Sequence, residues 1–309
     1  MTNEEHPHYL WLDGELVPWQ EATVHITALE WVGVGSVFEG IKAYRNEELG
    51  RAYVFRLDDH LARFADSMKL VELESRFSPR ELKEAVVELL RANEVCQDTY
   101  IRPFAFASRG RYLSRGSPEA VTCVLINLFP FESHLKTDDA VHCCVSSWTR
   151  ISDNVMPPRI KAVANYWNSR LAGNEATRNG YDSAILLNER GKVAEGPGAC
   201  LMLVRRGRVI TPLVTAGILE SITRDTLIHL FRQELEVEVV EREVDRTELY
   251  LAEEAFFCGT GAEVRPILSV DRFPVGDGQI GPLTRQIGAL YHDVVRGIEG
   301  RYREWRTLV

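Results

Sequence analysis

Residues 158–166 read PRIKAVANY, and this stretch decides how the rest of the chain is interpreted. The three residues after Lys161 are small or apolar, and Asp153 is the sole acid among the ten residues before it. Loss of hydration lowers the pKa of a lysine amine and makes it a nucleophile toward aldehydes. Most lysines are solvated surface residues, however, so this stretch alone does not establish a reactive amine.

A second unusual stretch, VAEGPG at residues 193–198, places Glu195 between an apolar pair and a glycine-proline-glycine turn. A carboxylate held against a pyridine nitrogen keeps that nitrogen protonated, which makes pyridoxal phosphate an electron sink. Glycines in the following turn would let the backbone approach the ring closely. The alternative is a surface glutamate that ends a strand before a turn.

Three short stretches contain groups that bind phosphate. ESITRD at 220–225 places hydroxyls and unpaired backbone N–H groups at the start of an expected helix, and CGTGAE at 258–263 has glycines that permit a nest of N–H groups. HLARF at 60–64 offers a cation. Each stretch alone is equally typical of a helix cap or a solvated arginine. The candidate phosphate ligands are Arg63, Ser221, Ile222, Thr223, Thr260, Gly261 and Ala262.

The composition excludes several classes of protein. A length of 309 residues favours two domains, and 45% hydrophobic with 26% charged residues is typical of a globular protein. The net charge of −9 argues against binding to nucleic acid. No apolar run approaches the roughly 20 residues of a membrane span, and the acidic N-terminus lacks an apolar signal core, so we expect a cytoplasmic protein. The cysteines and histidines show no CxxC or HExxH spacing, so we expect no catalytic metal.

The pattern of elements predicts an α+β fold. Asp13-Gly14 predicts a hairpin turn, and Ser78 with Glu81 predicts a capping box at the start of a helix. We expect further helices at 165–179, stopped by Gly180, and from Pro282 to Glu299. The polar stretch at 131–139 is the expected linker between a domain at 1–130 and a domain at 140–309.

Eight motifs, in their order and spacing, resemble the fold-type IV pyridoxal-phosphate enzymes, and most closely the branched-chain amino-acid transaminases of aminotransferase class IV. The motifs are SVFEGIKAY, HLARF, YIRP, KAVANY, GYDSAILLNERGKVAEG, GILESITRD, LYLAEEAFFCGTGAEVRPI and VGDGQIGPLTRQI. The resemblance covers almost the whole chain. It implies a small N-terminal domain, a larger C-terminal α/β domain that binds pyridoxal 5'-phosphate, an active site between the domains, and a homodimer or higher homo-oligomer.

The resemblance also implies roles for individual residues. Lys161 would form the Schiff base with the cofactor and shuttle the proton between Cα and C4′. Glu195 would pair with the pyridine nitrogen, and Tyr166 would hydrogen-bond the phenolic oxygen. Residues implied to hold the phosphate are Arg63, Ile222, Thr223 and Thr260.

The YIRP motif distinguishes the branches of this fold. Its Tyr100 would bind the substrate α-carboxylate together with the N–H groups of Gly261 and Ala262. Its Arg102 would bind the distal carboxylate of glutamate or 2-oxoglutarate. Phe38 and Lys42 match pocket-lining positions. The alternatives are core packing for the aromatic residues and a structural salt bridge for Arg102. The expected reaction moves the amino group of leucine, isoleucine or valine to 2-oxoglutarate by a ping-pong route.

Three positions depart from the family pattern and leave the substrate range open. Gly33 stands where a tyrosine is usual, with Trp31 or Trp11 as candidates to fill the space. Cys200 replaces an asparagine, and Lys42 replaces an arginine that would make bidentate contacts. The alternatives within the fold are a transaminase of D-amino acids, (R)-amines or aromatic substrates, and an aminodeoxychorismate lyase. A non-catalytic cofactor-binding homologue would have been expected to lack the lysine or the glutamate.

Overall fold

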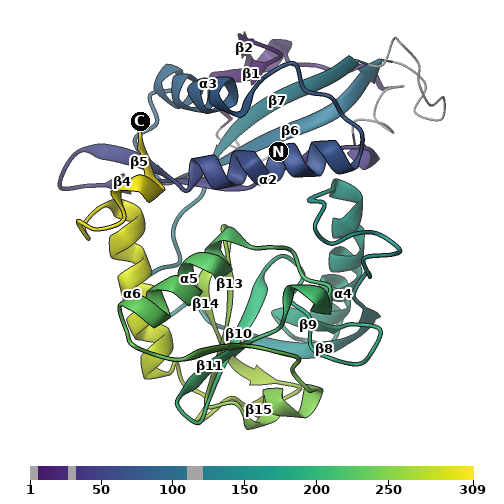
Figure 1. Ribbon diagram of the computed structural model, residues 1–309, viewed down its shortest axis with the longest axis vertical. Helices are drawn as coiled ribbons and strands as arrows, with labels where there is room; N and C mark the ends of the chain where they lie inside the picture. Colours follow the sequence, from purple (N-terminus) through teal and green to yellow (C-terminus); the bar gives the residue numbers. More distant parts are fainter. Residues whose placement is uncertain (1–5, 27–32, 110–120) are drawn as a thin grey trace. The chain divides into compact units, whose positions relative to one another are not determined.

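The computed structural model describes residues 6–26, 33–109 and 121–309 (Figure 1). The chain divides into two compact units. The first unit consists of residues 1–132, 160–164 and 294–309, and the second of residues 133–159 and 165–293. The chain first passes from one unit to the other inside the expected linker at 131–139. In contrast to the expected division, the first unit also takes in residues 160–164, which carry Lys161, and the C-terminal residues.

The first unit is built on one sheet with the strand order β16-β5-β4-β6-β7-β1-β2, and β3 pairs with β6. Asp13 and Gly14 both have positive φ between β1 and β2, as the predicted hairpin turn requires. The strands are β1 (Tyr9–Leu12), β2 (Glu15–Pro18), β3 (Val37–Phe38), β4 (Ile41–Asn46), β5 (Arg51–Phe55), β6 (Thr99–Arg109), β7 (Val121–Pro130) and β16 (Arg306–Leu308).

Two helices, α2 (Leu57–Leu70) and α3 (Pro79–Ala92), pack their apolar side chains on one face of this sheet. Figure 1 shows both helices beside β6 and β7. The predicted capping box at the start of α3 is confirmed, since Ser78 accepts from the backbone N–H of Glu81 and Glu81 accepts from that of Ser78. The other face of the sheet is not covered by these two helices.

Strand β6 divides its side chains between these two faces. Ile101 and Ala105 are buried in the core beneath the helices. Tyr100, Arg102 and Phe104 alternate with them and are half-buried. The face of β6 that carries Tyr100 and Arg102 is therefore opposite the helical core.

The second unit is built on a mixed sheet with the strand order β12-β11-β10-β13-β14-β8-β9, and β15 pairs with β14. Each unit thus combines one large sheet with a few helices, which confirms the predicted α+β class. The strands are β8 (Val141–Thr149), β9 (Ser183–Leu187), β10 (Cys200–Arg205), β11 (Arg208–Thr211), β12 (Val239–Glu241), β13 (Glu254–Gly259), β14 (Glu263–Val270) and β15 (Phe273–Pro274).

Helix α4 (Tyr166–Arg178) packs against β8 and β9, and α5 (Ile222–Gln233) packs against β13. Gly180 follows α4 with a φ of 72°, as predicted for its stop. Helix α6 (Pro282–Arg296) ends three residues before the predicted end at Glu299. Gly297, with a φ of 72°, takes the left-handed conformation that ends the helix before Gly300 can.

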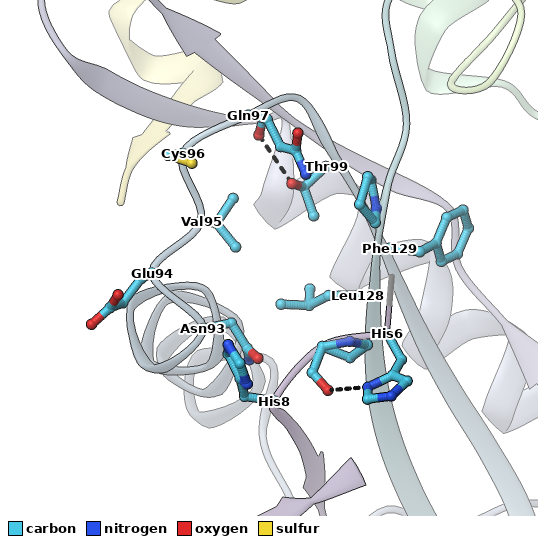
Figure 2. A pocket seen from close by; sticks show the side chains of 12 residues that line it. His6, His8, Asn93, Glu94, Val95, Cys96, Gln97, Thr99, Leu128 and Phe129 are labelled. Carbon is cyan, nitrogen blue, oxygen red and sulfur yellow. Dashed lines mark hydrogen bonds between the residues drawn. The ribbon is translucent and has the colours of Figure 1, made fainter. Parts of the chain in front are cut away.

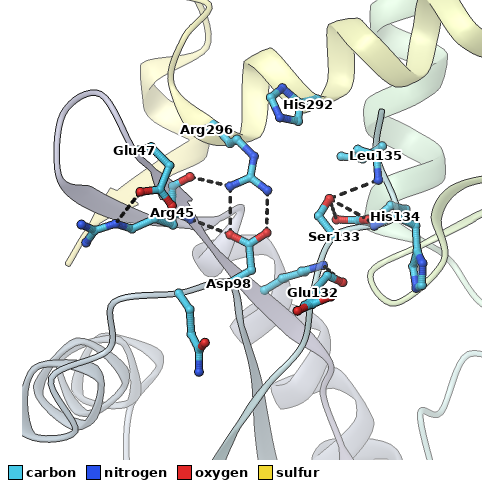
Figure 3. A network of polar contacts seen from close by, with 12 residues as sticks. Arg45, Glu47, Asp98, Glu132, Ser133, His134, Leu135, His292 and Arg296 are labelled. Atoms are coloured by element: carbon cyan, nitrogen blue, oxygen red, sulfur yellow. Dashed lines mark hydrogen bonds and ion pairs between the residues drawn. The ribbon is translucent and has the colours of Figure 1, made fainter. Parts of the chain in front are cut away.

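Polar contacts inside each unit lie close to residues 132–133 and 293–294, two of the four points at which the chain passes from one unit to the other (Figure 3). In the first unit the Arg296 guanidinium forms a bidentate pair with Asp98 at 2.9 and 2.5 Å. In the second unit Ser133 Oγ and the backbone N–H of His134 donate to Glu263, at 3.0 and 2.6 Å.

Candidate active site

Lys161 is anchored in the first unit through its backbone. Its N–H donates to Ser67 Oγ at 3.2 Å, and its carbonyl accepts from the N–H of Phe38 at 2.9 Å. Next to it, the N–H of Val163 donates to the carbonyl of Ser36 at 3.0 Å. The Lys161 side chain is 8% exposed. A segment far along the sequence thus becomes an added partner of β3, and the amine is held in a defined, buried position.

The Lys161 amine lies over an aromatic side chain. Its Nζ atom is 4.8 Å from the ring centroid of Phe38. The Arg102 guanidinium is 4.9 Å from the same centroid and 4.8 Å from that of Phe104. A cation over an aromatic face is attracted by the ring quadrupole. The structure therefore brings the predicted residues Lys161 and Arg102 together at the ring of Phe38, which was also predicted. Phe104 is an additional member of this group.

Tyr100 forms part of an aromatic wall on the same face of the sheet. Its ring centroid is 5.0 Å from that of Phe129 and 5.5 Å from that of Phe131. A Cβ atom at Gly40 would lie 1.8 Å from the Tyr100 hydroxyl oxygen. Glycine is required at this position because the hydroxyl lies directly against the backbone of the FEGI stretch.

Lys42 extends along this wall and is 1% exposed. Its Nζ atom donates to the carbonyl of Glu132 at 3.2 Å and lies 4.9 Å from the ring centroid of Phe131. The ammonium group is therefore held at the end of the wall. Sequence reasoning missed Phe131, because nothing in its local pattern distinguishes it from a core residue.

Arg63, on α2, faces a carboxylate. Its Nε donates to Glu39 Oε1 at 2.7 Å and its Nη2 donates to Glu39 Oε2 at 2.8 Å. His60 Nδ1 lies 2.8 Å from the same Oε2 atom. The sequence pointed to Arg63 as a cation but gave no indication of these two buried partners.

Glu195 lies in the second unit and is 4% exposed. Its Oε1 atom accepts from Nη2 of Arg150 at 2.7 Å. Arg150 is itself buried, and its Nε donates to the carbonyl of Gly217 at 3.2 Å. Sequence reasoning missed Arg150, because an arginine at the end of a strand is typical of a surface residue. Glu195 is therefore a buried carboxylate oriented by a buried arginine.

The other oxygen of Glu195 makes longer contacts. Oε2 is 3.7 Å from Cys200 Sγ and 3.4 Å from the N–H of Leu219. Burial, followed by the charge of Glu195, raises the pKa of the Cys200 thiol well above its usual value. Cys200 is therefore protonated and can donate a weak hydrogen bond to the carboxylate.

The turn after Glu195 shows why a glycine follows it. A Cβ atom at Gly196 would lie 2.6 Å from Cε1 of Phe257. A Cβ atom at Gly198 would meet no described atom within 4 Å. Gly196 is thus required by the protein's own packing, whereas Gly198 leaves space beside the turn.

The candidate phosphate ligands of the second unit lie in two turns. Ser221 caps α5 by accepting from the N–H of Arg224 at 3.2 Å, so Ile222 and Thr223 occupy the first turn of the helix. Thr260, Gly261 and Ala262 form the turn between β13 and β14. The stretch that holds Glu195 touches both regions. Leu219 just before α5 contacts Glu195, and a Cβ at Gly259 would lie 3.5 Å from that of Ala199.

Tyr166 and the departures from the family pattern are placed as follows. Tyr166 is the first residue of α4 and is half-buried. A side chain at Gly33 would meet no described atom within 4 Å. Trp11 does not fill that space, because it is buried in the core with its ring against Phe77 at 4.9 Å. Trp31 lies outside the described residues.

A separate cavity of about 510 Å³ lies in the first unit (Figure 2). It is lined by residues that include His6, His8, Asn93, Cys96 and Gln97. None of the predicted site residues lines it, but Phe129 of the aromatic wall does. Among the residues that the structure describes, no cluster of acids, histidines and cysteines is arranged to hold a metal ion. Within that same part of the chain, every helix is too short or too polar to span a membrane.

Comparisons with known proteins identify similar chains. The family model of class IV amino-transferases matches residues 36–270. A probable branched-chain-amino-acid aminotransferase of Aquifex aeolicus is 40% identical over 304 residues, which cover 97% of this chain and 96% of that protein. The branched-chain amino acid aminotransferase of Thermobaculum terrenum, solved in its PLP-form, is 50% identical with a TM-score of 0.95, covering 99% of both chains.

A third similar protein was solved with an amino acid. The branched-chain aminotransferase of the thermophilic archaeon Thermoproteus uzoniensis, solved with norvaline, is 42% identical with a TM-score of 0.90. The match covers 98% of this chain and 99% of that one. The likeness therefore extends over both units of the chain.

Proposed function

Because the chain belongs to the class IV aminotransferase family, we propose that it transfers the amino group of branched-chain L-amino acids to 2-oxoglutarate with pyridoxal phosphate. The observation that carries this proposal is the face around Phe38. A buried amine, a guanidinium and a tyrosine hydroxyl share that face with aromatic rings. Such a surface suits an amino acid with an apolar side chain and also one with a second carboxylate.

The residues present fit pyridoxal phosphate. The cofactor needs an amine for its aldehyde, an anion for its ring nitrogen and N–H or hydroxyl groups for its phosphate. Lys161 is a buried amine, and Glu195 is a buried carboxylate oriented by Arg150. The start of α5 offers N–H groups and the buried hydroxyl of Thr223. When bound, the cofactor carries the amino group between the two substrates and withdraws electrons from the substrate Cα.

We propose for the cofactor-binding residues the roles that the family resemblance implies. Lys161 removes and returns the proton at the substrate Cα, because a buried amine can exchange a proton there. Glu195 holds the proton at the ring nitrogen, and Tyr166 donates to the phenolic oxygen. The phosphate is bound by Arg63, Ile222, Thr223 and Thr260, with Ile222 contributing its backbone N–H.

The substrate is bound at its carboxylates. Tyr100 and the N–H groups of Gly261 and Ala262 bind the α-carboxylate. Arg102 binds the distal carboxylate of glutamate or 2-oxoglutarate, and it lies over aromatic rings when the substrate side chain is apolar. Phe38 and Lys42 complete the pocket. The position of the Arg102 guanidinium over two rings supports this dual role, since the ring faces attract the cation when the substrate brings no second carboxylate.

We further propose that the enzyme is a cytoplasmic homodimer or higher homo-oligomer. Trp148 and Trp167 are 43% and 63% exposed, and the segments that carry them are joined by a 2.9 Å hydrogen bond from Asn168 to the carbonyl of Thr149. Exposed aromatic residues gathered in this way are typical of subunit interfaces. The six cysteines are all free, which fits a reducing compartment.

A spectrophotometric titration of the purified protein with its cofactor tests the proposal. L-leucine, D-alanine and (R)-1-phenylethylamine are added separately, with no acceptor, while the visible band of the bound cofactor is followed. We expect only L-leucine to bleach the band. Bleaching by D-alanine or by the amine instead would retain the cofactor and fold but overturn the substrate proposal, and it would point to Gly33 and Lys42 as the cause.

A substitution at Arg102 tests the dual role. We expect Arg102→Ala to raise the KM for 2-oxoglutarate by roughly 10- to 100-fold, because a charged hydrogen-bond donor to a carboxylate is lost. The KM for leucine should change little. Equal losses for both substrates would assign Arg102 to a structural role.

A further inference from the structure

A fully buried carboxylate in the first unit has no place in the roles described so far. Glu39 is 0% exposed and lies between Phe38 and Gly40, in the FEGI stretch. Its neighbours Phe38 and Gly40 face Lys161 and Tyr100, whereas Glu39 points to the opposite side and contacts α2. Burial of a charged group is costly, so this position needs an explanation.

Hydrogen bonds from three groups hold the Glu39 carboxylate. Arg63 contributes two, at 2.7 Å to Oε1 and at 2.8 Å to Oε2. His60 Nδ1 lies 2.8 Å from Oε2, and the N–H of Gly40 donates to the same atom at 3.2 Å. Two parallel bonds to one carboxylate fix the plane of a guanidinium group as well as its position. They use the Nε and Nη2 atoms of Arg63.

The charges of this cluster balance. Burial raises the pKa of Glu39, but the charge and hydrogen bonds of Arg63, together with those of His60, outweigh burial and hold it well below its usual range. Burial lowers the pKa of His60, and the contact with Glu39 offsets this only in part. At neutral pH His60 is therefore uncharged and donates its Nδ1 proton to Glu39. The attraction of this cluster for an anion thus depends on how Arg63 is oriented rather than on excess positive charge.

We propose that Glu39 is a positioning residue, which orients Arg63 for the phosphate of the cofactor. The inference rests on the proposed function, in which Arg63 binds that phosphate. An arginine side chain has many rotamers, and the carboxylate restricts them before the cofactor arrives. Without the Glu39 carboxylate, Arg63 loses its bidentate partner and the phosphate meets a poorly oriented donor.

A pair of ligands isolates this effect. Pyridoxal phosphate and pyridoxal share the ring and the aldehyde and differ in the phosphate. A defect that acts through Arg63 must weaken binding of pyridoxal phosphate and leave binding of pyridoxal unchanged. A general loss of structure would weaken both.

The experiment uses the full-length protein, stripped of cofactor and titrated with each aldehyde by absorbance. For Glu39→Gln we expect the Kd of pyridoxal phosphate to rise about tenfold or more, because the amide opposes one Arg63 donor with its own N–H groups. The Kd of pyridoxal should stay the same. Glu39→Asp keeps the charge but shortens the reach, and it should show the same selective loss if the Gln variant does not fold.

A matched control comes from the second unit. Glu248 is also a buried carboxylate held by arginine, at 2.8 and 2.6 Å from Arg242. Glu248→Gln should leave both Kd values unchanged. If a folded Glu39 variant binds each aldehyde with the same Kd as the parent protein, this inference is overturned and the proposed function is not affected. A parent protein that binds neither aldehyde would overturn the proposed function, and this inference with it.

Discussion

In each unit a buried carboxylate is paired with an arginine, and the two pairs differ in how the carboxylate is held. In the first unit both oxygens of Glu39 lie within 2.8 Å of strong donors, on Arg63 and His60. In the second unit Glu195 Oε1 lies 2.7 Å from Arg150. The Oε2 atom of Glu195 has longer contacts, at 3.7 Å to a thiol and 3.4 Å to a backbone N–H.

This difference separates two uses of a buried carboxylate. Each carboxylate oxygen can accept about two hydrogen bonds. Strong donors at both oxygens of Glu39 suit a residue that orients another side chain. The long contacts of the thiol and the backbone N–H with Oε2 of Glu195 compete poorly with a charged N–H, which suits the proposed contact with a ring nitrogen. The same residue type thus supports a positioning role in one unit and a direct cofactor contact in the other.

The largest effect that we expect lies outside both pairs, at Lys161. Lys161→Ala should lower turnover by about 10⁴-fold or more, because the variant lacks both the amine for the cofactor aldehyde and the group that moves the Cα proton. Rapid-mixing kinetics of the leucine half-reaction measure this loss. The exposed Lys69 on α2 provides the control, and Lys69→Ala should keep full activity. An active Lys161→Ala variant would show that the reaction does not depend on Lys161, and it would contradict the proposed roles of both carboxylates in that reaction.

The next effect sharpens the contrast between the two carboxylates. Glu195→Gln should lower kcat by roughly 10- to 150-fold, since a charge-assisted hydrogen bond to the ring nitrogen is lost. Its Kd for pyridoxal phosphate should change less than that of Glu39→Gln. Steady-state kinetics and cofactor titration of the two variants, side by side, give this comparison. The same pattern in both variants would remove the distinction between positioning and direct contact.

The smallest effect concerns stability in acid. Both Glu39 and His60 have lowered pKa values in the folded protein. Burial raises the pKa of Glu39, but its pairing with Arg63 and His60 outweighs burial. For His60 burial is the main cause of the lowered pKa. Below pH 6.5 an unfolded histidine takes up a proton that folded His60 does not, and below pH 4.5 the same holds for Glu39. The unfolding free energy therefore falls as the pH falls, by at most about 1.4 kcal/mol per pH unit for each proton.

Urea denaturation at several pH values between about 7 and 5 measures this fall. His60→Gln should flatten it, because the variant has no group at this site that titrates near neutral pH. His8→Gln changes an exposed histidine and should leave the slope as it is. An unchanged slope in His60→Gln would show that His60 does not contribute to the pH dependence.

Much of the local structure could be predicted from the sequence. The hairpin at Asp13-Gly14 and the capping box at Ser78 depend on residues within a few positions of each other, so their patterns are visible locally. The end of α6 was predicted too late, because Gly297 and Gly300 are equivalent stop signals in the sequence and the structure uses the first.

The partners of the site residues could not be predicted. Arg150 contacts Glu195, and His60 contacts Glu39, only because separate elements of one unit pack together. The need for glycine at position 40 likewise comes from the hydroxyl of Tyr100, on a different strand. No local pattern encodes such contacts, since each depends on where the chain returns.

Motifs and hydrophobic periods were enough to predict the fold class and the family and to indicate candidate residues, because they are local properties of the chain. The tertiary structure decided that Lys161 joins the first unit as a partner of β3, held by Ser67 and Phe38. It also decided which donors reach each oxygen of the two buried carboxylates, and at what distance. The physical reason is that the burial and hydrogen bonding of a charged group are set by elements that meet only in the folded chain.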